Sequence, residues 1–449
     1  MDKFKNIIIG FGKAGKTLAK YLAQHNETVL LIERSKQMYG GTCINVGCLP
    51  SKNLIFNGQR GVDFTTAVNK RGEMTRQLRN KNYHMVADEP LATVWDGSAR
   101  FIDNYVLAVV MSDGTTKKVR GERIFINTGA VPNWPSIPGL EFSQRIFTSK
   151  EAMELKKQPK RLAIIGGGYI GLEFAGMFNS FGTHVTIFDQ HTRLLEREDP
   201  DIATEVVADL TDAGIEIKLA TQLTQVKDNG EKVTLYYQQG DQTNTAEFDA
   251  VLVAVGRRPN VSRLGLENTD IALTNRGAIQ VDDHLRTTVQ NIWALGDVNG
   301  GPMFTYVSLD DFRIIIDQLF GKGDRSTADR MVIPTASFLN PPLANVGLNE
   351  RQAKSAGYDL QTFKLSVKAI PKARVLENQR GLYKVIVDQK THLILGATLY
   401  AAEAHETINL IALAMKAKLP YERLRDMIYT HPTMSEALND LFKTPVVKS

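Results

Sequence analysis

The chain has 449 residues, of which 43% are hydrophobic and 23% charged, and its formal net charge is +5. At roughly 100–200 residues per domain this length predicts several domains, and the composition excludes a disordered chain, a coiled coil and a collagen-like fibre. The basic residues are scattered along the sequence, so we expect no nucleic-acid partner.

Neither export nor membrane insertion is expected from this sequence. The apolar run before Gly10 consists of three isoleucines, which is too short for the core of a secretory leader. No stretch of about 18 uncharged apolar residues occurs, so we expect no membrane span. We place the protein in the cytoplasm, because the scarcity of cysteine suits a reducing compartment.

The start of the chain has the pattern of a dinucleotide-binding βαβ unit. Residues 5–9 predict a short buried strand, residues 10–15 form a GxGxxG turn, and an amphipathic helix is expected to about Gln24. A second strand is expected over residues 28–32. In such units the glycines let the chain turn tightly and approach a pyrophosphate, the helix N-terminus holds the phosphate charge, and an acid after the second strand binds ribose. The predicted site consists of Gly10, Gly12, Gly15 and Glu33.

The only two cysteines, Cys43 and Cys48, lie in the sequence GGTCINVGCLPSK. A helix is expected to begin here, and its N-terminus together with Lys52 should lower the thiol pKa values. A structural disulfide across so short a loop would remove little entropy from the unfolded chain, and two sulfurs without a nearby histidine cannot complete a zinc site. We therefore expect reactive thiols, with a pair of inert buried thiols as the alternative.

The βαβ pattern recurs in the middle of the chain. Residues 161–165 predict a strand, the glycine turn 166–171 follows, a helix is expected to about Ser180, and a strand over residues 185–188 ends at Asp189. In both copies the acid follows the first glycine at the same spacing (33 − 10 = 189 − 166). One glycine fingerprint is weak evidence, but two in full context imply two dinucleotides, and flavin plus nicotinamide is the usual pair.

Asp189 also bears on the choice of nicotinamide. A carboxylate at this place binds a 2′-hydroxyl and repels a 2′-phosphate, which favours NADH. His191 and Arg193 follow closely and leave NADPH open.

The later segments predict crossings between domains and a separate C-terminal domain. Residues 125–132 and 251–259 are expected to be strands that end in glycine-proline turns, and residues 287–297 a strand that ends at an acid. From about residue 331 strands and helices alternate without a glycine fingerprint, which predicts an α+β domain. The strands expected there are 383–387 and 393–399, and the helices are 404–418 and 434–442.

The cysteine motif resembles that of the class I flavoprotein pyridine nucleotide-disulfide oxidoreductases, a family that includes dihydrolipoyl dehydrogenase, glutathione reductase and mercuric reductase. The two fingerprints, WALGD at 293–297 and HPTMSE at 431–436 stand in the family order, so the resemblance covers nearly the whole chain. It implies an α/β fold with two Rossmann-like, three-layer ββα dinucleotide-binding domains and a C-terminal α+β dimerisation domain. The implied ranges are 1–150 and 271–330 for the FAD-binding domain, 151–270 for the NAD(P)-binding domain and 331–449 for the dimerisation domain.

The resemblance further implies an NAD(P)H-dependent flavoenzyme with a redox-active disulfide. Cys48 would face the flavin and Cys43 would attack the substrate, while Lys52 and Glu173 match a pair beside flavin N5. Tyr169 matches the aromatic residue that covers the nicotinamide pocket.

An acid–base pair is also implied. His431, which precedes an expected cis proline, and Glu436 match the residues that each subunit of a homodimer lends to its partner. The other residues implied to bind FAD or NAD(P)H are Arg34, Gly41, Thr42, Thr128, Gly129, Gly166, Gly168, Ile170, Gly171, Gly256, Gly296 and Asp297, together with Lys52, and no resident metal is expected.

Five stretches resemble the reactive-chlorine-resistance (RclA-type) branch, whose members are described as hypothiocyanous acid reductases. This branch implies NAD(P)H-dependent reduction of HOSCN to thiocyanate in defence against host oxidants, and the electrophilic sulfur of this small oxidant suits attack by a thiolate. The stretches are residues 79–88, 308–316, 324–330, 369–374 and 431–442.

Other functions stay open from the sequence. Dihydrolipoyl dehydrogenase is the first alternative, whereas mercuric reductase is disfavoured by the lack of a second cysteine pair and glutathione reductase by Asp189. Copper(II) reduction is another, with Met427, His431 and Met434 as conceivable soft ligands, although two core methionines are the simpler interpretation. A flavoprotein redox sensor is the non-enzymatic alternative, and the acid–base pair speaks against it.

Overall fold

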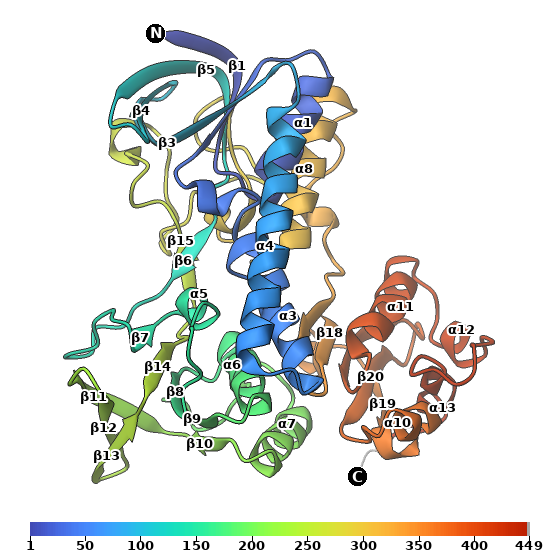
Figure 1. Cartoon of the computed structure of the whole chain (residues 1–449). Helices are drawn as coiled ribbons and strands as arrows, with labels where there is room; N and C mark the ends of the chain where they lie inside the picture. The colour runs from blue at the N-terminus through green and yellow to red at the C-terminus, as the bar shows by residue number, and fades with distance from the viewer. Residues whose placement is uncertain (447–449) are drawn as a thin grey trace. The chain divides into compact units, whose positions relative to one another are not determined.

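The computed structural model describes residues 1–446 and divides them into two compact units (Figure 1). The first unit comprises Met1–Pro135, Thr148–Gln158 and Val255–Asp329. The second comprises Ser136–Phe147, Pro159–Ala254 and the chain from residue 330 onward. Each unit is therefore assembled from segments that are far apart in the sequence.

The first unit is built on a mainly parallel sheet. β1 (Asp2–Ile9) lies between β2 (Val29–Glu33) and β5 (Thr116–Ile126), and β16 (Ile292–Ala294) extends the sheet beside β5. β3 (Ala92–Asp103) pairs with β2, and β4 (Val106–Met111) joins β3 to β5 in an antiparallel meander. All five residues of β2 are buried, as expected for a parallel strand covered on both faces.

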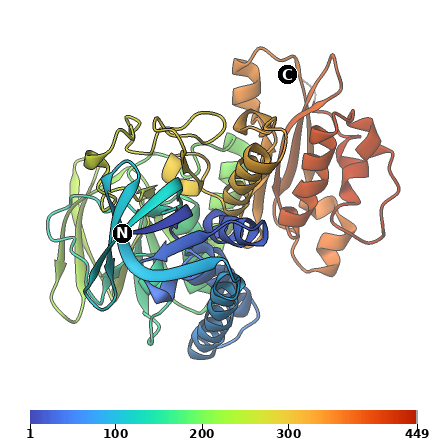
Figure 2. The ribbon, with the colours of Figure 1, turned by 90° about the horizontal axis from the view of Figure 1, so that it is seen from above.

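Three long helices lie side by side in the first unit (Figures 1 and 2). They are α1 (Lys13–Gln24), α4 (Phe64–Ala87) and α8 (Thr305–Phe320). α1 buries Ala14, Leu18 and Leu22, which recur at helical spacing and form its inner face. The shorter elements of this unit are η1 (Lys36–Met38), α2 (Thr42–Asn45), α3 (Cys48–Gln59), β6 (Ala130–Pro132) paired with β15 (Arg257–Pro259), α5 (Ser149–Ala152), η2 (Leu266–Asn268), η3 (Gly296–Asn299) and η4 (Thr327–Asp329).

The first part of the second unit repeats this plan. A parallel sheet runs in the order β10-β9-β8-β14-β7, and a separate antiparallel meander consists of β11, β12 and β13. The helices are α6 (Tyr169–Ser180) and α7 (Pro200–Asp212). The strand bounds are β7 Ile146–Phe147, β8 Arg161–Ile165, β9 His184–Phe188, β10 Glu216–Lys218, β11 Thr221–Asp228, β12 Val233–Gln239, β13 Gln242–Phe248 and β14 Ala250–Val253.

The C-terminal part of the second unit is an antiparallel sheet in the order β17-β18-β21-β20-β19. Its core includes Tyr383, Leu399, Ile408 and Leu438. The strands are β17 (Thr335–Ser337), β18 (Leu343–Gly347), β19 (Leu360–Ser366), β20 (Leu382–Asp388) and β21 (Ile394–Tyr400), and the helices are α9 (Glu350–Ser355), η5 (Val367–Ala369), α10 (Pro371–Val375), α11 (Ala404–Lys416), α12 (Glu422–Arg425) and α13 (Ala437–Leu441).

The predicted fold class is confirmed, and several predicted elements differ in extent. The expected strand 125–132 is split into β5 and β6 around Gly129, and 251–259 is split into β14 and β15 around Gly256, because both glycines have positive φ. Within the expected strand 287–297 the paired strand covers Ile292–Ala294, and the expected helix 434–442 is limited to Ala437–Leu441. The four domain ranges stay a prediction. Among residues 1–446, no helix has the length and hydropathy needed to cross a bilayer.

Candidate active site

The first glycine turn has the backbone geometry of a phosphate-binding loop. Gly10 has a φ of +106°, and its N–H donates to the carbonyl of Ile32 at 2.9 Å. A Cβ added at Gly15 would lie 2.5 Å from the carbonyl oxygen of Gly10, so only glycine lets α1 begin this close to the turn. Gly12 is the N-cap of α1 and has no side chain to cap the helix, and among the first amides of α1 the N–H of Gly15 donates to the side chain of Asn127 at 2.9 Å. The other amides of this helix start are therefore directed at a ligand site.

Glu33 is held at the end of β2 by backbone amides. Its Oε2 accepts from the N–H of Phe11 at 3.0 Å, and its Oε1 accepts from the N–H of Ser35 at 3.2 Å. Burial raises the pKa of Glu33, and the amide hydrogen bonds oppose this shift. The carboxylate thus lies where a βαβ unit places the acid that binds ribose.

The second glycine turn repeats the same contacts. Gly166 has a φ of +104°, and a Cβ at Gly171 would lie 2.0 Å from the carbonyl oxygen of Gly166. Asp189 accepts from the N–H of Gly167 at 2.6 Å, just as Glu33 accepts from the residue after the first glycine of its own copy. The sequence repeat is therefore also a repeat of hydrogen bonds.

The two cysteines lie in successive helices. Cys43 is in α2, Cys48 is the first residue of α3, and Lys52 follows one turn later on α3. The structure has both cysteines as thiols, with the Cys43 side chain hydrogen-bonded to Cys48. This hydrogen bond, burial and the charge of Cys48 raise the pKa of the Cys43 thiol.

The prediction of a lowered pKa is thus wrong for Cys43 in the dithiol form. The reason is the proximity of the two sulfurs. The hydrogen bond with Cys48 and then burial favour the neutral thiol, and ionisation of Cys43 would also place a negative charge beside Cys48.

Cys48 belongs to a cluster that includes Asp297, one of the residues implied to bind FAD. Its Sγ lies 3.6 Å from Oγ1 of Thr305 at the start of α8. Burial and then the charge of Cys48 raise the pKa of Tyr306 to about 12. Burial raises the pKa of Asp297, and the nearby Arg257, whose charge also interacts with Cys48, opposes that rise. This placement suits the flavin-facing role predicted for Cys48.

Two anchoring residues were absent from the predicted site. Asn127 accepts from the N–H of Gly15 at 2.9 Å and donates to the carbonyl of Leu295 at 2.6 Å. Asp311, which is 1% exposed, accepts from the N–H of Gly296 at 2.5 Å. In the sequence, Asn127 and Asp311 were marked only by their place in the stretches FINTGAVP and SLDDFRIII. Their hydrogen-bond partners could not be read from the sequence, because the fold brings these distant residues together.

The remaining predicted FAD residues surround this cluster. Gly41 has a φ of +79°, and a Cβ there would lie 2.8 Å from Cα of Gly12, so the cysteine loop passes directly against the first glycine turn. The hydroxyl of Thr128 donates to the carbonyl of Asn260 at 2.8 Å. A helix start that follows directly on the glycine turn, a close glycine contact and a partly buried acid that interacts with Arg257 near a thiol together fit FAD. Among the other predicted residues, Thr42 is the first residue of α2, and Arg34 is exposed directly after β2. Positive φ values occur at Gly129, Gly256 and Gly296. The start of α6 contains Gly168, its N-cap, and Ile170.

In the second unit, Tyr169 is tied to an acid that the sequence did not reveal. Its hydroxyl donates to Oε1 of Glu198 at 2.6 Å, and the same oxygen accepts from Nδ2 of Asn345 at 3.1 Å. Burial raises the pKa of Glu198. On the same helix as Tyr169, Glu173 is 8% exposed and accepts from the N–H of Phe338 at 2.8 Å. Its predicted pairing with Lys52 stays a prediction.

His431 and Glu436 form the predicted pair. Nδ1 of His431 lies 2.8 Å from Oε2 of Glu436, and the His431–Pro432 peptide is cis, as expected. The imidazole is 67% exposed, so its other ring nitrogen is accessible to a reacting group. A carboxylate beside Nδ1 keeps the proton of the neutral ring on Nδ1, which leaves Nε2 as the ring nitrogen that can exchange a proton.

The two methionines considered as copper ligands differ in exposure. Met434 is fully buried in the C-terminal core, whereas Met427 is 42% exposed. The interpretation of both as core residues is therefore right for Met434 and wrong for Met427. Among the described residues, no group of three or more His, Cys, Asp or Glu side chains is arranged to hold a metal ion.

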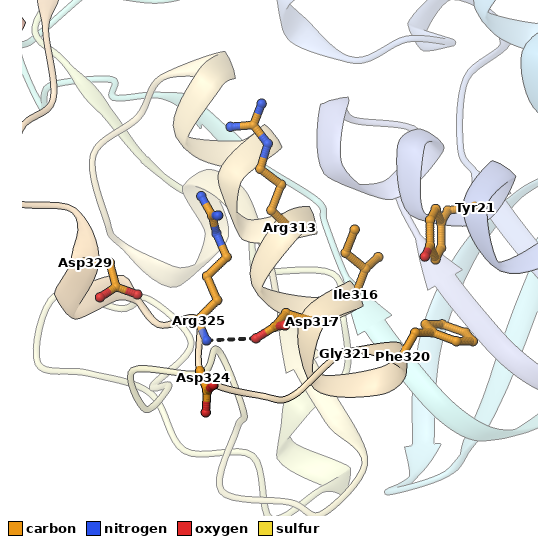
Figure 3. A pocket seen from close by; sticks show the side chains of 9 residues that line it. All are labelled: Tyr21, Arg313, Ile316, Asp317, Phe320, Gly321, Asp324, Arg325 and Asp329. Carbon is orange, nitrogen blue, oxygen red and sulfur yellow. Dashed lines mark hydrogen bonds between the residues drawn. The ribbon is translucent and has the colours of Figure 1, made fainter. Parts of the chain in front are cut away.

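A hollow of about 590 Å³ lies in the first unit (Figure 3). Arg325 binds the segment after α8 to that helix. Its backbone N–H donates to Asp317 at 2.8 Å, and its guanidinium donates to Asp310 at 2.5 Å. Parts of the stretches 308–316 and 324–330, both of which resemble the family branch, contact each other here. The lining residues, none of which is a predicted site residue, are Tyr21, Arg313, Ile316, Asp317, Phe320, Gly321, Asp324, Arg325 and Asp329.

Family models match most of the chain. The model described as pyridine nucleotide-disulphide oxidoreductase matches residues 4–311, and the dimerisation domain of the same name matches residues 333–442. The chain belongs to this family. It is therefore an NAD(P)H-dependent flavoprotein disulfide reductase that uses FAD, and its dimerisation domain supports a homodimer.

Individual relatives agree with this assignment. The chain is 48% identical to the "probable pyridine nucleotide-disulfide oxidoreductase RclA" of Escherichia coli K12, over 98% of this chain and 99% of the relative. It is 34% identical to a mercuric reductase of Lysinibacillus sphaericus, over 97% and 82%. It is 32% identical to a dihydrolipoyl dehydrogenase of Corynebacterium glutamicum, over 98% and 97%.

Solved structures show the same similarity. A Cu(II) complex of the HOCl-induced flavoprotein disulfide reductase RclA from Escherichia coli matches with a TM-score of 0.95 and 47% identity, over 99% of both chains. The same reductase without copper in its description matches with a TM-score of 0.94, over 98% of this chain and 99% of the other. The resemblance to the RclA-type branch is thus confirmed.

Proposed function

We propose that this chain reduces hypothiocyanous acid to thiocyanate at the Cys43–Cys48 dithiol with electrons from NAD(P)H. The observation that carries the proposal is the hydrogen-bonded thiol pair, in which Cys48 lies in the cluster with Asp297 and Arg257 while Cys43 lies in α2. The similarity to an HOCl-induced relative supports an oxidant as the substrate.

The chemistry needs only the two thiols and one oxidant. The thiolate of Cys43 attacks the sulfur of HOSCN, so that an S–S bond forms and hydroxide leaves. Cys48 then attacks the sulfur of Cys43, which forms the Cys43–Cys48 disulfide and releases thiocyanate. Bound FAD would supply the two electrons that return the disulfide to the dithiol, with NAD(P)H as their source.

His431 and Glu436 are proposed to handle the proton. Nε2 of His431 would donate to the departing hydroxide, so that water leaves instead, and Glu436 fixes the tautomer and stabilises the charged ring. The family resemblance assigns this pair to the partner subunit of the dimer. The homodimer would then be required for turnover.

NADH is the proposed nicotinamide, with NADPH as the alternative. Asp189 is the acid in the ribose position, and its Oδ1 accepts from the backbone and the ring of His191 at 2.9 and 2.6 Å. The ratio of kcat/KM for NADH to that for NADPH tests this preference, and a ratio below one would contradict it.

Copper(II) reduction is the second candidate. It is favoured by the adjacent sulfurs of Cys43 and Cys48, which are soft donors of the kind that bind Cu(I). A Cu(II) complex is described for the Escherichia coli relative. A Cu(II) complex is also described for the C43S mutant of that relative, so the dithiol is proposed as the source of electrons and not as the complete set of ligands.

One anaerobic experiment separates these functions. The holoenzyme is reduced with NADH and mixed in turn with HOSCN, lipoamide, glutathione disulfide and Cu(II), and flavin reoxidation is followed by stopped flow. We expect HOSCN to reoxidise the enzyme fastest, with NADH and HOSCN consumed in equal amounts. Slow reoxidation by HOSCN would refute the proposal, and turnover of dihydrolipoamide with NAD+ would indicate a dihydrolipoyl dehydrogenase.

The same experiment tests a redox sensor. Negligible steady-state turnover with every oxidant would favour a protein whose disulfide state controls a partner. A Cys43→Ser protein serves as the control, since it should bind FAD and accept electrons from NADH without reducing HOSCN.

A further inference from the structure

A buried lysine lies beside the cysteine loop, and the proposed chemistry does not use it. Lys16 is on α1, directly after the first glycine turn, and is 4% exposed. Its Nζ lies 3.3 Å from the carbonyl oxygen of Gly40 and donates to Oδ1 of Asn82 on α4. Gly40 is only three residues before Cys43. The ammonium group is therefore fixed against the backbone of the loop that carries the attacking thiol.

The start of the 79–88 stretch holds this loop from the other side. Nε of Arg79 donates to Oδ1 of Asn45 at 2.8 Å, and Asn45 in turn donates to the carbonyls of Tyr39 and Gly41 at 2.9 Å. The ring of Tyr83 packs on that of Tyr39 at 4.8 Å. This stretch was singled out in the sequence for its branch resemblance, and the structure shows that it clamps the cysteine loop.

The electrostatics couple Lys16 to Cys43. Burial, followed by repulsion from Lys13, lowers the pKa of Lys16 to about 8, while the charge of Cys43 opposes that shift. The charge of Lys16 in turn opposes the raised pKa of Cys43. The ammonium form of Lys16 still predominates at neutral pH. Arg79 on α4 is the other cation bound to this loop.

We propose that Lys16, held by Asn82 and the Gly40 carbonyl, is a positioning residue whose buried positive charge stabilises the Cys43 thiolate for attack. A cation is needed there because Cys43 must ionise beside a second sulfur. A charge in a buried setting acts more strongly than one in water, since the effective dielectric constant is lower. The inference rests on the proposed role of Cys43 as attacking thiol and does not depend on which oxidant it attacks.

The test measures the thiol itself. The FAD-loaded enzyme is reduced with NADH under anaerobic conditions and treated with iodoacetamide between pH 5 and 10, and mass spectrometry follows alkylation of the Cys43 peptide. In Lys16→Met the midpoint of the pH profile should rise by about one unit, which is about a tenfold slower alkylation at neutral pH. The long-wavelength charge-transfer absorption of the reduced enzyme should persist in this variant, since it arises from the Cys48 thiolate that is proposed to face the flavin.

Two further variants separate charge from packing. Lys20→Met removes a lysine one turn along α1, which is 3.7 Å from Glu89 and partly exposed, and should leave the profile unchanged. Asn82→Ala removes the contact but keeps the charge, and should shift the midpoint by less than half as much as Lys16→Met.

Two results would overturn the proposal. The first is a midpoint of the alkylation profile that moves no further in Lys16→Met than in Lys20→Met. The second is a midpoint that moves as far in Asn82→Ala as in Lys16→Met. If Lys16→Met does not yield loaded enzyme, Lys16→Gln keeps a hydrogen-bond donor without the charge and must show the same upward shift. Alkylation of Cys43 needs no HOSCN. If the pH profile of Lys16→Met shifts as expected but the parent enzyme does not reduce HOSCN, the proposed function is refuted and this inference stands.

Discussion

Replacing the buried Lys384 by methionine should destabilise the second unit far more than replacing the exposed Lys354. Nζ of Lys384 lies 2.8 Å from Asp199, 2.9 Å from Glu350 and 3.2 Å from Asp201, and its side chain is 3% exposed. Lys354 contacts the same Glu350 at 2.7 Å but is 64% exposed. The two lysines thus share a partner and differ in burial.

Burial determines the expected magnitudes. Removing one partner of a buried ion pair leaves an uncompensated charge and costs about 3–5 kcal/mol of the free energy of unfolding. An exposed pair at helical spacing contributes only about 0.3–0.5 kcal/mol. Lys384→Met should therefore lose roughly ten times as much stability as Lys354→Met.

The deficit of Lys384→Met should shrink as the pH falls. The hydrogen bonds with Lys354 and then Lys384 lower the pKa of Glu350, and Lys364 and Lys384 lower that of Asp201 although burial would raise it. Carboxylates with lowered folded-state pKa values contribute stability above their unfolded pKa of about 4 and lose it as they are protonated. Without Lys384 this contribution is smaller, so the variant differs most from the parent near neutral pH.

The assay is urea unfolding of the FAD-loaded protein, followed by far-ultraviolet circular dichroism at one protein concentration and at pH 7 and about pH 3.5, on either side of the unfolded carboxylate pKa. The concentration is fixed because dimerisation and cofactor binding contribute to apparent stability. Equal losses in the two variants would refute the reasoning, because they would show that contact with Glu350, and not burial of the lysine, determines the effect.

Three predictions concern the proposed reaction. Cys43→Ser should retain FAD and its reduction by NADH and lose turnover of HOSCN, and retained steady-state activity would contradict the dithiol chemistry. His431→Gln should lower kcat by about 10²–10⁴-fold with the urea midpoint unchanged, because the side chain is 67% exposed; a kcat within threefold of the parent would argue against proton transfer. Tyr169→Phe removes the hydrogen bond to Glu198. If the ring covers the nicotinamide pocket, as the family resemblance implies, this variant should bind NADH up to about tenfold more tightly; an unchanged Kd in an equilibrium titration would show that this bond does not hold the ring.

The local patterns of the sequence predicted both dinucleotide-binding turns. Gly10 and Gly166 have nearly the same positive φ, and both acids accept a hydrogen bond from the residue after the first glycine. This success has a physical reason. A βαβ turn is built from residues within about 25 positions, and its glycines are required by backbone geometry alone.

The strand breaks and the meanders were less readable. Gly129 marks a weak point in the expected strand 125–132, but only the pairing partners of β5 and β6 reveal that the chain changes from one sheet to another there. Strand propensity describes how well a segment fits a pleated surface, and it does not specify which strand is beside it.

By itself the sequence determined the two nucleotide turns, because each depends on short-range spacing, and its resemblance to a known family over nearly the whole chain determined the fold class. Only the tertiary structure revealed that Asn127 joins the first glycine turn to Leu295, that Arg257 lies with Asp297 and Cys48, and that the pKa of Cys43 is raised by its neighbour. It also placed Lys16 against the cysteine loop. These features depend on burial and on contacts between distant segments, which no local pattern encodes.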